Sequence, residues 1–268
     1  KILTLRGWIL EEVIVYFRNN PEISILRRFI VLFYTFINWL IHKIFLILFV
    51  YDYITAVSKV TAHKNKVREA IIIPNPVLCN IKNLTFSTKK SSQDIVFVTY
   101  VSIGGGKIES IPYALLIVNL INKKVGSKYR VRLEIYGKDL PKHILDILSR
   151  FNFVDYKGFV KDYTTRIKNA DLFIAPYTFP ELGHASLEAV CVGVPVAKFT
   201  DNPQEEEIID MYNGILLNTD SDTIKKLIKY INSIEQLKHY LYINAYNTIL
   251  RRRNINVISL YWKSLVEN

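Results

Sequence analysis

The sequence contains few of the residues that mark several protein classes. Among its 268 residues are two cysteines, one methionine, ten glycines and nine prolines. Two cysteines exclude a disulfide scaffold, and we expect Cys79 and Cys191 to be buried or free thiols of a reducing compartment. Half of the residues are hydrophobic, so the chain is neither disordered nor of low complexity. Its length suffices for one large domain or two modest ones.

Positive charge is concentrated in the first third of the chain. Residues 1–95 carry 13 Lys and Arg against 6 Asp and Glu, or +7, whereas residues 96–268 carry 22 against 18, or +4. The basic part also holds the most apolar segment, and this combination favours an anionic membrane surface as a partner. No aromatic–glycine–basic signature or groove-reading helix is present, so nucleic acid is not an expected partner.

The most apolar segment, residues 29–51, is long enough to cross a membrane. On a helical wheel, however, a polar stripe about 140° wide comprises Arg28, Thr35, Asn38, His42 and Lys43. The pattern therefore predicts an amphipathic helix over about residues 28–51. Its apolar face either packs on a sheet or lies in a membrane interface, and the charged stripe disfavours a spanning helix.

The rest of the chain alternates between strand-like and helical patterns. Residues 53–58 and 70–77 predict strands, with a helical stretch between them, and residues 78–94 are typical of a linker. Beyond the linker, strands are expected at 95–101, 131–136, 153–156, 171–176, 194–199 and 214–217. Helices are expected at 108–124, 139–151, 163–169, 184–192, 203–212, 221–231 and 234–266. This alternation predicts a doubly wound Rossmann-type parallel sheet with its ligand outside the carboxyl ends of the strands.

The turn after the first of these strands contains Gly104, Gly105 and Gly106, followed by Lys107. Glycines let the backbone approach a ligand closely, and the next helix offers free N–H groups beside the lysine charge. These features suit a pyrophosphate. The spacing matches neither of the common glycine-rich nucleotide motifs, so a plain tight turn is the alternative.

The loop after the fourth of these strands leads through Glu181 and Gly183 into a helix that begins near His184. Glu188 lies one helical turn after His184 and is followed by the apolar run AVCVGVPV. A carboxylate in such a buried helix needs hydrogen-bond donors, and ribose hydroxyls would supply them. The pattern therefore favours a ligand role for Glu188 over a solvent-exposed one.

These segments resemble the donor site of retaining GT-B glycosyltransferases of family 4. The most specific match is PELGxxxLEAxxxGVPV at residues 180–196, and weaker matches occur in order from residue 53 to the end of the chain. The resemblance implies an α/β, GT-B-like fold with one complete Rossmann-type donor domain and a partial N-terminal Rossmann-like domain. We expect the N-terminal part and linker at 1–90, the donor domain at 91–250, and a helix at 251–268 that packs back toward the N-terminal domain.

The resemblance also implies roles for the loop residues. Lys107 and the amides of Gly104, Gly105 and Gly106 would neutralise the departing donor diphosphate, Glu181 would contact the donor sugar, and Glu188 would hold the ribose. The other donor-binding residues would be Gly137, Gly158, Phe159, Val160, Gly183, His184 and Ala185. The acceptor is thought to attack on the face that the leaving group departs, so the diphosphate can take the acceptor proton. This scheme needs a UDP- or GDP-linked sugar as donor and no cofactor or metal.

The chain departs from the family pattern in several places. Six residues separate Glu181 from Glu188 where the family usually has seven, and Ile103 stands at the position of the phosphate-loop arginine. Arg6 stands where many relatives have histidine. Residues 1–76 resemble only the last part of an N-terminal domain, and the chain begins with Lys1. We therefore expect the opening strands of that domain to lie outside this sequence.

These observations favour a glycosyltransferase whose acceptor is a sugar, a lipid-linked molecule or a protein, with a lipid-linked or membrane-associated one preferred. We therefore expect a cytoplasmic location, with peripheral attachment to the cytoplasmic face of the membrane as a further possibility. The alternative is a non-catalytic nucleotide-sugar-binding or regulatory subunit. A Rossmann oxidoreductase is disfavoured, because Lys123, Lys124 and Lys128 occupy the region where such enzymes need an acidic residue.

Overall fold

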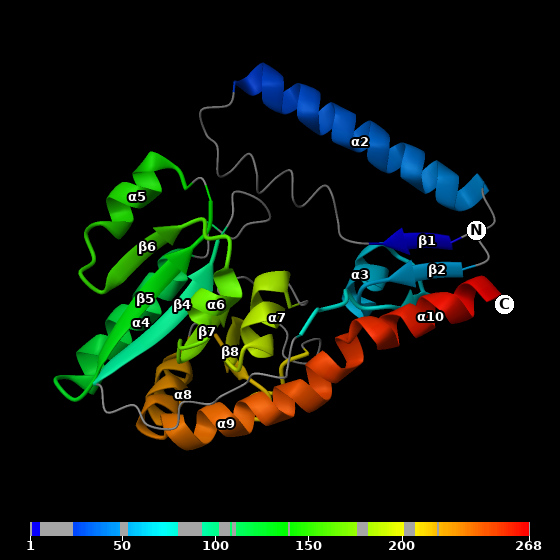
Figure 1. Ribbon diagram of the computed structural model, residues 1–268. Helices are drawn as coiled ribbons and strands as arrows, with labels where there is room; N and C mark the ends of the chain where they lie inside the picture. Colours follow the sequence, from blue (N-terminus) through cyan, green and yellow to red (C-terminus); the bar gives the residue numbers. More distant parts are fainter. Residues whose placement is uncertain are drawn as a thin grey trace. The chain divides into compact units, whose positions relative to one another are not determined.

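The protein is described here by a computed structural model (Figure 1). It describes residues 2–5, 24–48, 53–79, 93–101, 108, 111–138, 140–175, 182–200, 207–218 and 220–267. The chain divides into two compact units. Unit 1 contains the described residues up to Pro76 together with residues 256–267, and unit 2 contains the described residues from Val77 to Ile255.

Unit 2 is built on a six-stranded sheet in which every pair is parallel. The spatial order is β6-β5-β4-β7-β8-β9. The strands are β4 (Asp94–Tyr100), β5 (Arg130–Tyr136), β6 (Val154–Gly158), β7 (Leu172–Ala175), β8 (Val196–Phe199) and β9 (Ile215–Leu217). Numbered along the chain, this order is 3-2-1-4-5-6, which is the Rossmann arrangement. The predicted fold class is confirmed.

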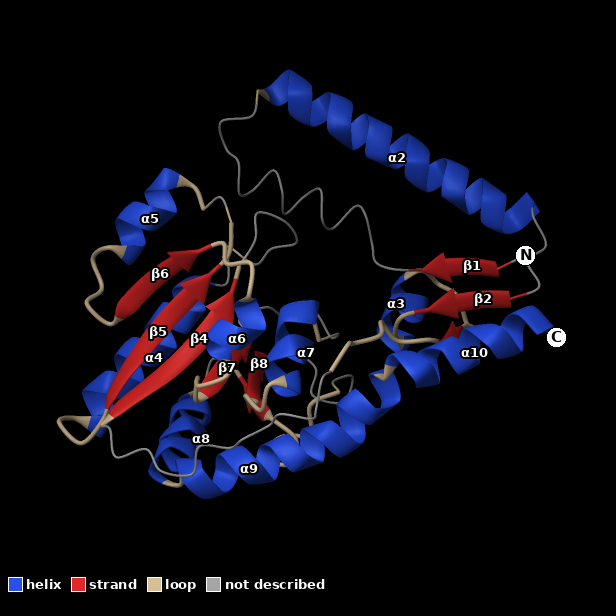
Figure 2. Ribbon diagram, in the orientation of Figure 1, coloured by secondary structure: helices blue, strands red, loops and turns tan. Residues whose placement is uncertain are grey.

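The apolar content of the strands explains why they lie in the middle of the unit. All four residues of β7 and of β8 are buried, as is all of β9. The helices that follow the strands cover the sheet (Figure 2), with α4 and α6 on opposite faces. They are α4 (Ile111–Val125), α5 (Lys142–Leu148), α6 (Tyr163–Ile167), α7 (His184–Cys191) and α8 (Ser221–Asn232).

The helix expected at 203–212 is wrong for the residues of this range that are described, because residues 207–212 form turns and a bridge. Side chains there replace the hydrogen bonds of a helix. The Asn213 side chain accepts from the Ile209 amide at 2.7 Å and donates to the Glu207 carbonyl at 3.1 Å. Asp210 accepts from the Leu216 amide at 2.8 Å. Asparagine and aspartate compete with helices in this way.

The long helical stretch expected at 234–266 is interrupted. It consists of α9 (Ile234–Ala245), a π turn η3 (Tyr246–Leu250), a 3-10 turn η4 (Arg251–Arg253) and α10 (Ile255–Glu267). Asn254 has ψ 134°, which is outside the helical range and separates η4 from α10. Its backbone instead forms a parallel bridge with Val77. The break therefore lies where the chain leaves unit 2.

Unit 1 contains a small parallel sheet of order β1-β2-β3, with β1 (Ile2–Leu5), β2 (Tyr53–Ala56) and β3 (Ile71–Ile72). Between β1 and β2 the chain forms α2 (Ile25–Leu48), close to the predicted range. The short helix α3 (Lys59–Lys64) follows β2 and starts at Ser58, whose hydroxyl accepts from the Thr61 amide. Ala56 and Ala62 form the buried centre of this small core.

The apolar face of α2 is exposed rather than packed on a sheet. Its large exposed side chains are Ile25, Leu26, Phe29, Ile30, Phe33, Tyr34, Phe36, Trp39, Leu40, Ile41 and Ile44. In the predicted polar stripe, Thr35 is buried and its hydroxyl donates to the Val31 carbonyl at 2.7 Å. No described helix combines the length and the apolar character required to cross a membrane.

The expectation of two free thiols is wrong in this structure, because Cys79 and Cys191 form a disulfide with a Cα–Cα distance of 5.2 Å. The backbone beside Cys79 is held by Val77, whose amide donates to the Arg253 carbonyl at 2.8 Å. Val77 and Cys191 belong to the same apolar core. A separation of 112 residues in the sequence gives no indication of this proximity.

Candidate functional site

The strand order places the candidate site at the carboxyl ends of β4 and β7. These neighbours pair at Phe97 with Leu172 and at Val98 with Phe173, and the chain continues from them to opposite halves of the sheet. A doubly wound sheet binds its ligand at such a switch point. The loops that follow β4 and β7 are the two singled out from the sequence. Lys107, Glu181, Gly104, Gly105 and Gly106 lie outside the described residues.

The helix α7 begins directly after the second of these loops. Gly183 is its N-cap, with φ −67° and ψ 160°, and having no side chain it forms no side-chain cap hydrogen bond. His184 is the first helical residue and is exposed, and Ala185 is partly buried. The first turn of a helix directs its N–H groups and the positive end of the helix dipole toward the preceding loop. The arrangement is suited to an anion bound at that loop.

Glu188 is half-buried one turn further along α7, between the buried residues Leu187 and Ala189. Burial raises the pKa of the Glu188 carboxyl, and the nearby His184 offsets part of that increase. Within the described part of the chain, no side chain forms an ion pair or hydrogen bond with this carboxylate. A half-buried carboxylate without protein donors is suited to hold hydroxyl groups of a ligand.

Gly137 lies where the ends of β4, β5 and β6 meet. Its φ is 141°, and its amide donates to the Gly158 carbonyl at 3.0 Å while its carbonyl accepts from the Tyr156 hydroxyl at 3.0 Å. A Cβ atom at Gly137 would lie 1.8 Å from the Val101 carbonyl oxygen. The structure therefore gives this glycine a packing requirement at the edge of the predicted donor site.

Gly158, Phe159 and Val160 follow one another at the end of β6. Gly158 has φ 66°, but a Cβ atom there would meet nothing within 4 Å. Phe159 is exposed, whereas Val160 packs against the apolar core of unit 2. This alternation places an exposed aromatic ring just beyond the strand end, next to the Gly137 contact. Such a ring is suited to border a nucleotide base.

A cluster of tyrosines under the same edge was missed by the sequence analysis. The rings of Tyr100 and Tyr163 are 5.2 Å apart and those of Tyr136 and Tyr163 are 5.4 Å apart, both edge to face. The Tyr136 hydroxyl donates to Glu134 Oε2 at 2.8 Å. Burial, together with this acceptor, raises the pKa of Tyr136. The only signal in the sequence is that adjacent strands β4 and β5 both end in tyrosine.

Lys198 was also missed. It is fully buried in β8, opposite Ala175 at the end of β7, and its Nζ donates to the Phe199 carbonyl at 3.3 Å. A lysine within the apolar run VPVAKF was visible in the sequence as an unusual charge in a buried strand.

Metal ligands were not expected, and the described residues contain no group of three His, Cys, Asp or Glu side chains able to hold a metal ion.

Several solved glycosyltransferase structures are similar to this chain. A variant of S. aureus TarM in complex with Fondaparinux, alpha-GlcNAc-glycerol and UDP has a TM-score of 0.65 at 18% identity, over 81% of this chain and 44% of that one. Anabaena HepE in complex with UDP and glucose has a TM-score of 0.60 at 18% identity, over 81% and 63%. The lipopolysaccharide outer core galactosyltransferase WaaB has a TM-score of 0.58 at 16% identity, over 80% and 61%.

These likenesses show the fold, which is that of the GT-B glycosyltransferases. The chain spans between 44% and 63% of the length of these three proteins. No curated protein matches its sequence.

The family itself is shown by a sequence profile. The profile described as Glycosyl transferases group 1 matches residues 93–234, which is 142 of the 268 residues and covers the sheet, α7 and both loops of the switch point. The chain therefore belongs to the group 1 glycosyltransferases.

Proposed function

We propose that this chain transfers a sugar from a nucleotide-sugar donor, with retention, to a lipid-linked or membrane-associated acceptor. The observation that carries the donor half is Glu188, a half-buried carboxylate with a raised pKa on the helix that follows the switch-point loop. Two neighbouring ribose hydroxyls would supply the hydrogen-bond donors that this carboxylate lacks within the described chain.

The chemistry needs stabilisation of the leaving diphosphate more than any other contribution. The bond between the anomeric carbon and the diphosphate oxygen breaks, and the acceptor oxygen bonds to the same face of that carbon. The acceptor proton passes to the departing diphosphate oxygen. Lys107, the glycine amides of its loop and the N-terminus of α7 would hold the developing negative charge, which lowers the barrier. Glu181 would orient the donor sugar.

We take the donor to be a UDP-sugar. The S. aureus TarM variant and Anabaena HepE were both observed with UDP. The exposed ring of Phe159 and the open space beside Gly158 leave room for a base at the end of β6. These features support a base at the end of β6, and comparing the rise in melting temperature with UDP-sugars and with GDP-sugars would test the choice of UDP.

The acceptor half of the proposal is supported by α2. Eleven large apolar side chains of this helix are exposed, and its first turn carries Arg27 and Arg28. An apolar face flanked by basic residues suits the interface of an anionic membrane. An enzyme held there would be presented to lipid-linked acceptors, and peripheral attachment at the cytoplasmic face of the membrane is part of the proposal.

The test of the donor site is Glu188→Gln, with Glu235→Gln as its control. Glu235 lies in the first turn of α9, is exposed, and undergoes the same chemical change. We expect UDP-sugars to raise the melting temperature of the parent and of the control. The affinity of Glu188→Gln should fall about 10- to 100-fold, because hydrogen bonds to a charged group are lost. Equal donor binding and turnover by all three proteins would refute the proposed role.

The same carboxyl predicts a pH dependence. Because burial raises the pKa of Glu188, its ionised form is disfavoured in the folded chain, and stability is lost as the pH rises through that raised value. Glu188→Gln should therefore melt higher than the parent at neutral pH and like the parent below about pH 4. In the parent, donor affinity should increase as the pH rises, whereas stability decreases. The reason is that the ionised carboxylate can accept hydrogen bonds from both ribose hydroxyls.

A non-catalytic nucleotide-sugar-binding or regulatory subunit is the second candidate, and Ile103 is the residue that favours it. The phosphate loop lacks the arginine of the family at that position, which leaves Lys107 as its cation. Donor binding without transfer or donor hydrolysis by the full natural chain would support this candidate over the enzyme.

A further inference from the structure

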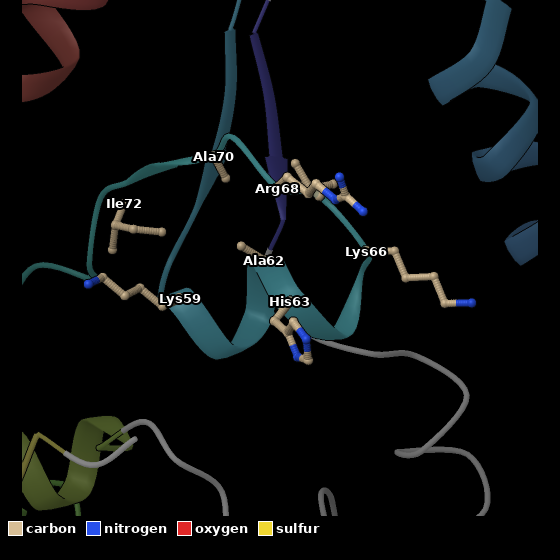
Figure 3. A pocket seen from close by; sticks show the side chains of 8 residues that line it. Lys59, Ala62, His63, Lys66, Arg68, Ala70 and Ile72 are labelled. Carbon is tan, nitrogen blue, oxygen red and sulfur yellow. The ribbon is translucent and has the colours of Figure 1, made fainter. Parts of the chain in front are cut away.

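Unit 1 contains a cavity of about 730 Å³ beside α3, between this helix, the turn after it and β3 (Figure 3). Its basic side chains do not converge on one point, because Figure 3 shows the ammonium ends of Lys59 and Lys66 directed away from each other. We assign no ligand to this cavity. The feature that bears on the proposed donor site lies in unit 2, at the carboxyl end of α7.

The helix α7 ends at a covalent crosslink. Its last residue, Cys191, is bonded to Cys79, which lies in the segment that enters unit 2. We propose that this disulfide is a redox switch, so that the oxidised chain binds the nucleotide part of the donor more tightly than the reduced chain. The inference rests on the proposed function, because the site that the switch regulates is the one that contains Glu188.

Glu188 and Cys191 share the last turn of α7. The Val192 amide, directly after Cys191, donates to the Glu188 carbonyl at 3.2 Å. Gly193 follows with φ 84° and ends the helix. With eight residues, α7 is too short to be stable by itself, so its order depends on its surroundings. The bond at Cys191 therefore restrains the backbone that carries the Glu188 carboxylate.

The contacts around the disulfide keep its two halves together after it opens. Val77, two residues before Cys79, is buried in the same apolar core as Cys191. Its amide donates to the Arg253 carbonyl at 2.8 Å, and its backbone forms a bridge with Asn254. None of these contacts includes a sulfur atom. We therefore expect the reduced unit to stay folded with its two thiols close together, so that the bond forms again on oxidation.

Opening of the switch is a thiol–disulfide exchange with a small thiol such as glutathione. Cys79 is the point of attack, because it is partly exposed whereas Cys191 is buried. The glutathione thiolate bonds to the Cys79 sulfur, and the electron pair of the broken sulfur–sulfur bond goes to Cys191. A second glutathione thiolate attacks the mixed disulfide and releases Cys79. The protein gains two electrons and two protons, and glutathione disulfide is formed.

The switch acts on affinity through the order of the last turn of α7. A carboxylate binds ribose hydroxyls most tightly when its backbone is already fixed, because ordering the backbone on binding costs free energy. The reduced chain has to order this turn when the nucleotide binds. Linkage makes the effect reciprocal, since a nucleotide that prefers the oxidised chain by some factor stabilises the disulfide by the same factor.

The experiment measures the redox equilibrium of the full chain in glutathione buffers, with and without saturating UDP. Alkylation of free thiols followed by mass measurement of the intact chain gives the fraction reduced, and the chain contains no cysteine besides these two. Calorimetry gives the UDP affinity of each state. We expect about tenfold weaker binding by the reduced chain. Saturating UDP should then make the midpoint potential about 30 mV more negative.

Variants separate the switch from a general effect of the reductant. Cys79→Ser should bind UDP like the reduced parent and should not respond to glutathione. Glu188→Gln should reduce the shift in midpoint potential caused by UDP, because the regulated carboxylate is absent. Glu235→Gln is its matched control and should keep the full shift, since Glu235 is exposed on α9. A melting curve of the reduced parent verifies that it is folded at the assay temperature.

The outcomes distinguish the switch from the proposed function. Equal UDP affinities in the two states, or an unchanged midpoint potential with UDP, overturn the switch and leave the donor proposal intact. A chain that unfolds whenever the disulfide is reduced also overturns the switch, because the bond is then required for folding. A chain that binds UDP in neither state overturns the donor proposal and the switch together.

Discussion

Gly137 lies where three strand ends meet, and its backbone has a conformation that other residues rarely adopt. The Val101 carbonyl occupies the space where its side chain would begin. Gly158, one strand away, also has a positive φ, 66° against 141° at Gly137, but open space around it. The two positions therefore favour glycine for different reasons: close approach of another backbone at Gly137 and backbone conformation alone at Gly158.

Gly137→Ala should destabilise unit 2 by at least about 3 kcal/mol, because the new Cβ overlaps a backbone carbonyl that cannot move without breaking the β4–β5 register. Gly158→Ala should cost only about 1 kcal/mol, the cost of the positive φ. Denaturant unfolding of both variants measures the difference. Similar losses for the two variants would show that close approach is not the constraint at Gly137.

Glu188 and Lys198 are charged side chains within two apolar elements that follow β7 in the chain, α7 and β8. Glu188 is half-buried on α7, and Lys198 is fully buried at the end of β8. Burying a charge is costly unless a partner or ligand compensates for it. Lys198 donates to the Phe199 carbonyl, whereas Glu188 has no ion-pair or hydrogen-bond partner among the described residues, so a functional site is expected at Glu188.

At the scale of elements, α2 differs from α4 and α7 of unit 2. Those two helices bury apolar residues against the sheet, whereas the large apolar residues of α2 are exposed. A periodicity of 3.6 residues predicted the helix correctly in both cases. It did not determine what covers the apolar face, because that depends on the neighbours of the helix.

Replacing Phe29 and Phe33 together by Glu should reduce binding to phosphatidylglycerol-containing vesicles at least about tenfold, since two exposed aromatic side chains leave the bilayer interface. Asn38→Glu is the control, because it adds an acidic residue at another exposed position of α2. Cosedimentation with anionic and zwitterionic vesicles measures the effect. A parent chain that does not bind anionic vesicles, or a double variant that binds as well as the parent, would contradict the membrane role.

At the scale of the molecule, the segment that enters unit 2 is fastened to the end of α7 and to the segment that leaves. The Cys79–Cys191 disulfide provides the first connection, and the bridge between Val77 and Asn254 provides the second. Arg253, next to that bridge, is buried and pairs with Glu207 at 2.6 Å. The disulfide also removes the cysteine argument for a reducing compartment.

Reduction of the disulfide should lower the free energy of unfolding of unit 2 by about 4 to 5 kcal/mol, because it releases a loop of more than 100 residues in the unfolded chain. Urea unfolding with and without dithiothreitol measures this loss. Cys79→Ser should unfold like the reduced parent and be insensitive to the reductant. Two reactive thiols in the denatured but unreduced parent would contradict the disulfide.

Much of unit 2 could be predicted from local patterns. The six strands lie within a few residues of their expected positions, and α7 begins at His184 as expected. The helix expected at 203–212 was the main wrong prediction of secondary structure within the described part of unit 2. Residues 207–212 have apolar and acidic residues at helical spacing, but the side chains of Asn213 and Asp210 take up the backbone hydrogen bonds. Those contacts exist only when β9 and the preceding turn are in place.

The Rossmann sheet, its switch point and the family of the chain could be read from the amino-acid order, because apolar runs and the motif around Glu188 are local properties. The close approach of Gly137 to Val101 and the pairing of Cys79 with Cys191 required the folded chain. Both depend on residues far apart in sequence, which no local pattern brings together.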